Sequence, residues 1–274
     1  MREVFWNDKG KIEALQEFFG LCLTRETKYE KALFCLGEGM NGKSVILYVL
    51  QQLLGPENYS AVMLESLQNT HYVADLFGKL ANISLETSAK SSVYDSIFKA
   101  VVSGDPIQAD AKYKKPIKFR PFCKLVFALN NMPRVDDKTD AFFRRILLIR
   151  FTRQFTEEEQ DKNLKTTLET ELDGILLWSL EGLRRLRARG YFNLTRTMQE
   201  EVQNYRRQNN NIILFLEDAC EFVSCSTVSK DRLYRAYRSW CAENGCHALS
   251  KVHFGKDLLK QHPELEEYRD AHGR

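Results

Sequence analysis

The chain has 274 residues, of which 43% are hydrophobic and 28% charged, a composition that predicts a folded globular protein. No segment approaches the ~20 apolar residues of a membrane span, and the polar start Met1-Arg2-Glu3 shows no secretion signal. The net charge is only +3, but residues 111–153 contain twelve Lys or Arg and three Asp, which predicts an anionic partner or counter-surface.

The first predicted elements are a helix, a strand and a second helix. Apolar residues recur with helical spacing over 11–23, and the short apolar run 32–36 predicts a strand. The apolar run 45–54 predicts a helix that ends at Gly55-Pro56. A loop of unusual composition, residues 37–44, joins this strand to this helix.

That loop reads Gly-Glu-Gly-Met-Asn-Gly-Lys-Ser and fits G-x-x-x-x-G-K-[ST], the phosphate-binding loop of P-loop NTPases. Its glycines allow backbone N–H groups to surround a phosphate, and the helix after it directs the positive end of its dipole at the same anion. We expect the Lys43 amine to reach the β- and γ-phosphates and the Ser44 hydroxyl to bind Mg²⁺. The predicted nucleotide-binding residues are Gly37, Gly39, Asn41, Gly42, Lys43, Ser44 and Val45.

Alternating strand and helix signals continue to residue 151 and predict a mostly parallel sheet with covering helices, hence an α/β fold. The predicted strands are 59–62, 79–86, 124–130 and 141–151. The segment 66–77 is either a helix or an irregular connection, and 92–102 is an amphipathic helix stopped by Gly104-Asp105-Pro106. Residues 107–119 alternate in places and carry Lys and Pro in the middle, which predicts a β-hairpin with a basic tip.

After residue 153 the pattern becomes helical. Thr156-Glu157-Glu158-Glu159 begins with a capping box, and 173–189 predicts an amphipathic helix. We expect its leucines to be buried and its arginines to form a solvated face; the leucines are Leu176, Leu177, Leu180, Leu183 and Leu186. A polar run at 208–211 predicts a hinge, followed by helices over 212–222, 230–243 and 251–261.

The cysteines indicate a reducing environment and not a disulfide framework. There are seven, an odd number, and several lie in apolar runs, so we expect buried free thiols in a cytosol. Cys220-x4-Cys225 and Cys241-x4-Cys246-His247 raise a zinc alternative, which is weak because Cys220 and Cys241 fall on apolar helix faces.

Taken in order, these motifs resemble the superfamily 3 helicases within the AAA+ ATPases. The similarity is to the helicase part of phage, plasmid and pox-virus primase-helicases and covers about residues 10–260. Besides the P-loop, it is carried by Ser103-Gly104-Asp105-Pro106, Lys112-Tyr113-Lys114-Lys115-Pro116, Leu129-Asn130-Asn131-Met132-Pro133 and Phe142-Phe143-Arg144-Arg145-Ile146. No single motif after the P-loop is decisive; their order and spacing are.

The resemblance implies catalytic roles beyond Lys43. Glu86 stands at the family's second acidic motif, where it would act with Ser44 as a Mg²⁺ ligand or polarise the attacking water. Here Ser84-Leu85 stand before Glu86 in place of a paired acid, so both roles remain open, and so does a helix-cap role. Asn130 would be the polar sensor, with a turn-forming role as the alternative. Arg145 would be the arginine finger that reaches a neighbouring subunit's ATP, with Arg144 as the alternate.

The resemblance also implies a DNA channel and a C-terminal module. Lys112, Lys114 and Lys115 would grip the backbone of single-stranded DNA, with Tyr113 available to stack; the alternative is a charged edge that blocks strand pairing. Residues 209–274 resemble a winged-helix module with an incomplete wing. Its predicted core is Leu233, Tyr234, Tyr237 and Trp240, and its candidate recognition helix carries Lys251, His253, Lys256 and Lys260.

The sequence thus predicts an ATP- and Mg²⁺-dependent DNA helicase motor of replication, a self-assembling ring with a hexamer as the expected size. The expected domains are a helical lead-in (1–29), an AAA+ core (30–153), a helical linker (154–208) and the winged-helix-like module (209–274). A primase or polymerase module would lie on another part of the protein or another chain, and the location would be the cytoplasm of a host cell of a phage or mobile element. The alternatives are a packaging ATPase and an initiator or DNA-binding assembly factor that uses ATP only to oligomerise.

Overall fold

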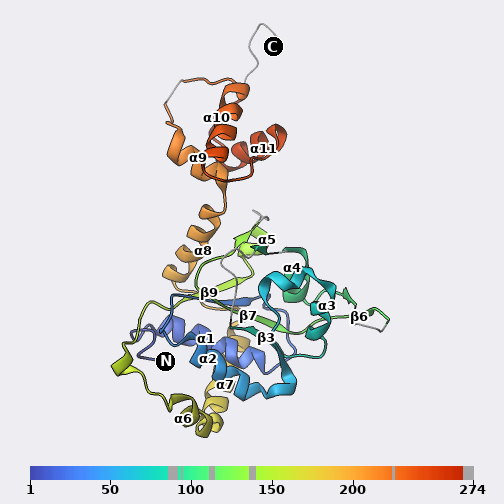
Figure 1. The fold of residues 1–274 in the computed structure, drawn as a ribbon, viewed down its shortest axis with the longest axis vertical. Helices are drawn as coiled ribbons and strands as arrows, with labels where there is room; N and C mark the ends of the chain where they lie inside the picture. The colour runs from blue at the N-terminus through green and yellow to red at the C-terminus, as the bar shows by residue number, and fades with distance from the viewer. Residues whose placement is uncertain (86–91, 94, 111–114, 136–139, 224–225, 268–274) are drawn as a thin grey trace. The chain divides into compact units, whose positions relative to one another are not determined.

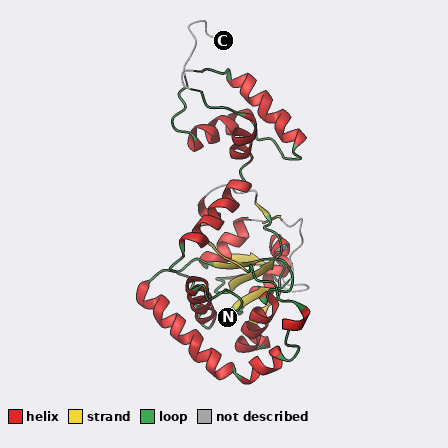
Figure 2. Ribbon diagram, turned by 90° about the vertical axis from the view of Figure 1, so that its left-hand side faces the viewer, coloured by secondary structure: helices red, strands yellow, loops and turns green. Residues whose placement is uncertain are grey.

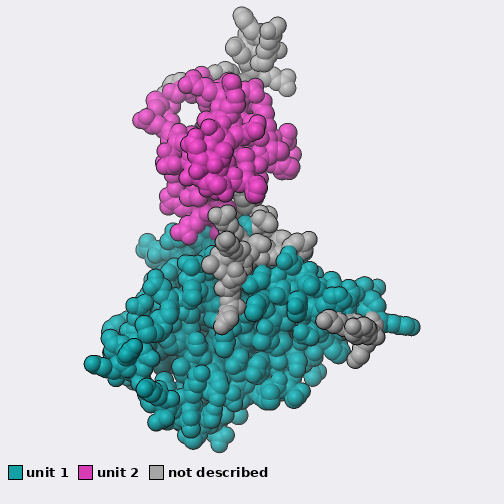
Figure 3. Space-filling view, viewed as in Figure 1, with its two compact units in different colours: residues 1–205 teal, residues 206–274 magenta. Residues whose placement is uncertain are grey.

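A computed structural model describes residues 1–85, 92–93, 95–110, 115–135, 140–223 and 226–267. They divide into two compact units, residues 1–205 and 206–274, each with its own hydrophobic core (Figure 3). None of the described helices is long and apolar enough to cross a membrane.

The first unit is built on a five-stranded sheet of order β2-β3-β7-β1-β9, in which every paired strand is parallel (Figure 1). The prediction of an α/β fold with a parallel sheet is therefore confirmed. The strands of this sheet are β1 (Ala32–Leu36), β2 (Tyr59–Ser60), β3 (Ala81–Ser84), β7 (Lys124–Leu129) and β9 (Ile146–Arg150). Two short pairs lie apart from it: β4 (Ser92–Val93) with β8 (Arg134–Val135) in parallel, and β5 (Ile107–Ala109) with β6 (Ile117–Phe119) antiparallel.

Helices cover both faces of the sheet, so the unit has three layers (Figures 1 and 2). Alternate residues of the central strands enter two separate cores, as the two-residue period of a strand requires; Leu33 and Cys35 face one and Phe34 and Leu36 the other. The first core is covered by α1 (Lys9–Cys22), α2 (Lys43–Leu54) and α7 (Leu172–Arg189), and the second by α3 (Thr70–Val73), α4 (Asp95–Ser103), α5 (Asp140–Phe143) and part of α8 (Arg196–Gln208). The remaining helical segments are α6 (Leu164–Thr170) and the 3-10 turns η1 (Pro56–Asn58), η2 (Leu64–Gln68), η3 (Ala74–Leu76) and η4 (Glu157–Glu159).

The helix pair α1 and α7 packs closely because glycine replaces a side chain at both contact points. A Cβ on Gly20 would lie 2.2 Å from the Ser179 carbonyl oxygen, and one on Gly182 would lie 2.5 Å from the Gln16 carbonyl oxygen. Neither distance is possible for a real side chain, so these positions accept only glycine at this separation. The lead-in helix and the helix after residue 172 therefore belong to one packed body.

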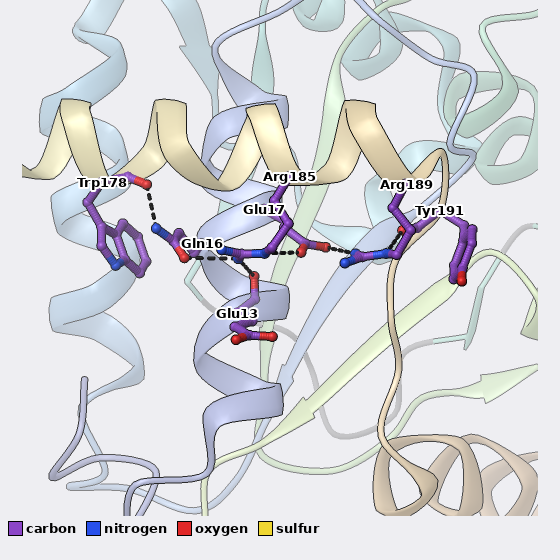
Figure 4. Close-up of polar contacts among 7 residues, drawn as sticks. All are labelled: Glu13, Gln16, Glu17, Trp178, Arg185, Arg189 and Tyr191. Carbon is purple, nitrogen blue, oxygen red and sulfur yellow. Dashed lines mark hydrogen bonds and ion pairs between the residues drawn. The ribbon is translucent and has the colours of Figure 1, made fainter.

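Polar contacts fasten the same pair (Figure 4). The buried carboxylate of Glu17 on α1 accepts from Arg185 at 2.8 Å and from Arg189 at 2.5 Å, both on α7. Gln16 donates its side-chain amide to the Trp178 carbonyl at 2.7 Å. The expectation that the arginines of this helix form only a solvated face is wrong for Arg185 and Arg189.

Three other expectations differ from the structure. The segment predicted as a strand from residue 141 begins instead with the helical turn α5, and only 146–150 form β9. Of the leucines predicted to be buried on α7, Leu183 and Leu186 are buried, whereas Leu176, Leu177 and Leu180 are 37%, 68% and 43% exposed. Helix α8 was not predicted, although Met198, Val202 and Tyr205 follow helical spacing and pack inward.

The second unit is a small helical body. It consists of α9 (Asn211–Ala219), α10 (Lys230–Glu243) and α11 (Lys251–Gln261), packed around the fully buried Tyr237. The predicted core residues Leu233, Tyr234 and Trp240 pack against the same cluster. Across the described part of residues 206–267 no strand is present, and the winged-helix character of this unit stays a prediction.

Candidate nucleotide-binding site

The strand order brings three predicted motifs to one edge of the sheet. Strand β7 lies between β1 and β3, with Leu129 beside Leu36 and Phe127 beside Ser84. Because parallel strands end at the same edge, the P-loop after β1, Asn130 after β7 and the residues after β3 are neighbours there. The Gly37 amide donates to the Leu129 carbonyl at 3.0 Å and fixes the start of the P-loop against the strand that ends at Asn130.

The P-loop has a backbone suited to an anion. Gly42 caps α2 with a left-handed conformation (φ 85°), and α2 has no side-chain cap at this end. The Lys43 N–H donates to the Asn41 side-chain oxygen at 3.4 Å, and this end of the helix is suited to an anionic acceptor from outside it. Met40 is also left-handed (φ 56°), which is uncommon for a residue with a side chain and is typical of a strained functional loop. A Cβ on Gly39 would meet nothing within 4 Å, so this part of the loop is open.

The Lys43 ammonium group is held inside this loop. It donates to the Gly37 carbonyl, to the Glu38 carbonyl at 2.8 Å and to the side-chain oxygen of Asn41 at 3.1 Å. Burial lowers the pKa of Lys43. A phosphate at the loop would place a negative charge beside this buried ammonium group.

A cavity of about 1330 Å³ opens over the P-loop. It is lined by the loop residues 39–45, by Asn130 and by Leu85, the residue before Glu86. Residues 1–4, 155 and 159–161 and the helices α6 and α7 form more of its wall, which includes the apolar side chains of Leu164, Leu168, Ile175 and Trp178 and the carboxylates of Glu159, Asp161 and Glu171. The cavity is large enough for a nucleotide and combines phosphate-binding groups with apolar groups. This wall was not predicted as part of the site, because nothing in a leucine-rich helical sequence shows which sheet edge it covers.

The predicted acid lies beyond the residues that can be placed. Glu86 is outside the described residues, whereas Ser84 ends β3 and is buried. Its role as metal ligand, base or cap therefore stays a prediction. Asn130 is exposed and lines the cavity, and its role as sensor or as turn former stays a prediction.

The two arginines of the predicted finger lie at the other edge of the sheet. The Arg145 carbonyl accepts from the Ala32 amide, so Arg144 and Arg145 stand where β1 and β9 begin, whereas the P-loop stands where β1 ends. A five-residue strand separates these edges by about 17 Å. Neither guanidinium therefore lies at the P-loop of its own chain.

The arginines differ in what they contact. Arg145 is buried: it donates to Ser103 Oγ at 2.8 Å and to the Ala141 carbonyl at 2.6 Å, and it forms an ion pair with Glu30 at 3.0 Å. The Arg144 side chain is 64% exposed, and within the part of the chain that the structure describes it approaches Glu30, at 3.9 Å. Which of the two is the finger stays a prediction, and Arg144 is the more exposed of them.

Most of the predicted DNA-contacting residues cannot be placed. Lys112, Tyr113 and Lys114 are outside the described residues, while β5 and β6 form the predicted antiparallel hairpin with Ile107 beside Phe119. Lys115 and Lys118 are exposed on it. Lys124, counted with the basic tract, is buried and donates to the Phe122 carbonyl at 2.9 Å, so it belongs to the core.

The zinc alternative gains no support. Within the described residues, which leave out Cys225, no three His, Cys, Asp or Glu are grouped so that they could hold a metal ion. The six described cysteines are free thiols; Cys22, Cys35, Cys123 and Cys241 are buried, as predicted, whereas Cys220 and Cys246 are partly exposed. Burial raises the pKa of Cys22 and of Cys35 to about 12, so both are inert at neutral pH.

Two sequence families match separate parts of the chain. Residues 35–145, from the P-loop strand to Arg145, match a family of unknown function (DUF5906). Residues 207–274 match the family described as poxvirus D5 protein-like and cover almost all of the second unit. The chain is thus similar to poxvirus D5-like proteins at its C-terminal end.

One curated relative spans both parts. "Putative helicase L207/L206" of Acanthamoeba polyphaga mimivirus is 26% identical over 264 residues, which cover 86% of this chain. The chain spans only 27% of that protein's length.

Solved structures share the fold. The apo structure of the NrS-1 C terminal region (305–718) has a TM-score of 0.64 and 12% identity, covering 100% of this chain and 72% of that one. The A form apo structure of the NrS-1 C terminal region has a TM-score of 0.60 and 14% identity, covering 76% of this chain and 49% of that one. At these identities the similarity establishes the fold.

Proposed function

We propose that this chain is the ATP-hydrolysing motor part of a replication helicase that translocates on single-stranded DNA. The observation that carries the proposal is the convergence of the P-loop, Asn130 and Leu85 in one cavity at the carboxyl edge of a β2-β3-β7-β1-β9 sheet. The similarity to a mimivirus protein named as a helicase and to poxvirus D5-like proteins supports a role in DNA replication.

ATP would lie in the cavity with its phosphates on the P-loop. Lys43, released from the Gly37 and Glu38 carbonyls, would bind the β- and γ-phosphates, and the N-terminus of α2 would add its N–H groups. The site fits Mg²⁺ because the exposed Ser44 opens the helix beside the phosphate loop; Ser44 would hold the ion, with Glu86 as a second ligand or as the base. The ion would neutralise charge on the phosphates, and Asn130 would orient the attacking water.

Hydrolysis would need a second subunit. Because Arg144 lies at the opposite sheet edge from its own P-loop, it can complete only a neighbour's site, where its guanidinium would stabilise charge on the transferring phosphoryl group. Arg145, held by Ser103 and Glu30, would position it. This requirement favours a ring, and a hexamer is the size that we propose.

DNA would be gripped by the β5–β6 hairpin. Lys112, Lys114 and Lys115 would bind phosphates, and Tyr113 would stack on a base. A C-terminal unit of winged-helix type would follow the motor, and a primase or polymerase module would belong to the rest of the protein or to another chain.

The test combines ATP hydrolysis, DNA binding and strand separation. We expect DNA-stimulated ATPase that is lost in Lys43→Ala while the protein stays folded, because the phosphate loses a charge-assisted contact. In the combined Lys112→Ala, Lys114→Ala and Lys115→Ala variant, the slope of log affinity against log salt should fall by about 0.7 per lost contact, with basal ATPase retained. Stimulated ATPase without strand separation would indicate a packaging-type motor, and ATP-dependent assembly without hydrolysis an initiator. Normal ATPase in Lys43→Ala would refute the proposal.

A further inference from the structure

The outward side of α7 carries a row of leucines. Leu176, Leu177 and Leu180 follow one another at helical spacing and are 37%, 68% and 43% exposed. Because an α-helix turns by about 100° per residue, this row lies on the side of α7 opposite to Ile175 and Trp178, which line the nucleotide cavity. The row therefore belongs neither to the core of the first unit nor to the nucleotide site. Neighbouring leucines at the surface of a folded unit are typical of a contact surface.

Two charged residues enclose the row along the helix. Asp173 lies one turn before Leu177, and Arg184 lies one turn after Leu180, and both charged residues are exposed. Residues 173, 177, 180 and 184 are separated by four, three and four positions, which is the spacing of a seam between two paired helices. We call these four residues the α7 seam. Along the chain the seam begins with a negative charge, continues with two leucines and ends with a positive charge.

The α7 seam is complementary to itself when its direction is reversed. If two copies of α7 lie antiparallel about a two-fold axis midway along the seam, Leu177 of each copy lies beside Leu180 of the other. The same axis places Asp173 of each copy beside Arg184 of the other, so that an attractive charge pair lies at each end of the leucines. A parallel pair would instead bring the two aspartates together and the two arginines together, which costs free energy. The order of the charges therefore selects an antiparallel partner related by a two-fold axis.

We propose that the α7 seam, with Leu176 at its edge, is the docking surface for the same seam of a second copy of this chain. Each copy contributes the same surface, so the contact is isologous and is complete when two copies have met. None of the four seam residues lines the nucleotide cavity, so the contact does not depend on the proposed function. The seam spans about 17 Å of helix, which makes a small interface, and we therefore expect a dimer that dissociates on dilution.

Charge reversal tests both the partner and the direction of the contact. In sedimentation equilibrium without nucleotide, Asp173→Arg and Arg184→Asp should each weaken dimerisation of the full chain by about tenfold or more, because like charges then meet at both ends of the seam. An equal mixture of the two variants should regain the wild-type affinity, because in the mixed dimer each of these arginines meets an aspartate. The double variant should regain it for the same reason. Arg238→Asp, at an exposed arginine of α10 in the second unit, is the matched control and should leave the affinity unchanged.

Any other outcome overturns the proposal. A wild-type chain that stays monomeric at its highest soluble concentration has no such contact, and self-association that neither reversal weakens uses another surface. Reversals that weaken association but are rescued neither by mixing nor by the double variant exclude the antiparallel pairing. Asp173 and Arg184 are exposed, so the single variants should keep the wild-type melting temperature, which separates a lost contact from a lost fold.

Discussion

Replacing Glu17 with Gln should destabilise the first unit through the contact between α1 and α7. Glu17 is 1% exposed and its two carboxylate oxygens accept from Arg185 at 2.8 Å and from Arg189 at 2.5 Å. Glutamine has nearly the same shape, but it carries no charge and turns an N–H₂ group toward one of the two guanidinium groups. The substitution therefore removes the electrostatic part of this contact with little change in packing.

The size of the effect follows from the exposure of the partners. A hydrogen bond to a charged group contributes about 1.5–3 kcal/mol, and two such bonds change here. The side chains of Arg185 and Arg189 are 30% and 20% exposed, so water can replace part of the hydrogen bonding that the guanidinium groups lose. The total loss of free energy for the two bonds is therefore near the lower end of the range. We expect the free energy of unfolding to fall by about 2–3 kcal/mol, which lowers the melting temperature of a unit of this size by roughly 4–12 °C.

Scanning calorimetry and far-UV circular dichroism measure this change, and the chain supplies a matched control. Glu200 pairs with Arg196 at 2.7 Å, but their side chains are 56% and 91% exposed. Glu200→Gln should therefore leave the melting temperature within experimental error. The reasoning would be refuted if Glu17→Gln and Glu200→Gln changed the melting temperature by the same amount.

Three further predictions follow from the geometry. Gly182→Ala should destabilise the first unit by about 1–3 kcal/mol, because the new Cβ meets the α1 backbone. Gly174→Ala on the same helix places its Cβ in open space and should stabilise the unit by up to about 1 kcal/mol. Urea titration of the two variants measures both changes in unfolding free energy. Burial lowers the pKa of Lys124 to about 8, so between pH 8 and about 10.5 the unfolded chain holds a proton that the folded protein has lost. As the pH rises across that interval, the free energy of unfolding of the wild type should therefore increase by up to about 3 kcal/mol relative to that of Lys124→Met. A difference in unfolding free energy between the two proteins that stays constant from about pH 7 to 10.5 would contradict the buried charge. Arg144→Ala should lower ATPase at least tenfold without weakening binding of a fluorescent ATP analogue, whereas weakened binding with unchanged turnover would contradict a role in trans.

The parallel sheet was predictable because its strands are short apolar runs separated by helical patterns. The same kind of signal misled at 141–145. Phe142 and Phe143 are consecutive and both enter one core, which a helical turn permits and a strand, with its alternating faces, does not. Two adjacent aromatic residues in a sequence do not show whether they form a helical turn or a strand, since both kinds of element can bury aromatic side chains.

The candidate site divides in the same way. The P-loop has a local motif, so its residues and their order could be predicted from the chain alone. The difference in burial between Arg144 and Arg145 could not, because it depends on where α5 ends and β9 begins, which aims one side chain at Ser103 and leaves the other exposed. The exposure of Leu177 could not be predicted either, because an apolar helix face has the same sequence pattern whether or not the rest of its own chain buries it.

The contacts of Arg145 also connect the proposed finger to the proposed DNA hairpin. Ser103, which accepts from Arg145, is the last residue of α4, and β5 of the hairpin begins four residues later at Ile107. Arg120, at the other end of the hairpin, donates to the Gly104 carbonyl at 3.4 Å. The residue beside the finger is therefore bonded to the base of the hairpin, whose tip would hold DNA. If binding of Arg144 to a neighbour's nucleotide shifts Arg145, the hydrogen bond of Arg145 to Ser103 at the base of the hairpin must change. Because coupling between two sites is reciprocal, DNA binding at the hairpin must in turn change the position of the arginines. Hydrolysis in one subunit would in this way change the position of the DNA-binding hairpin of the next subunit.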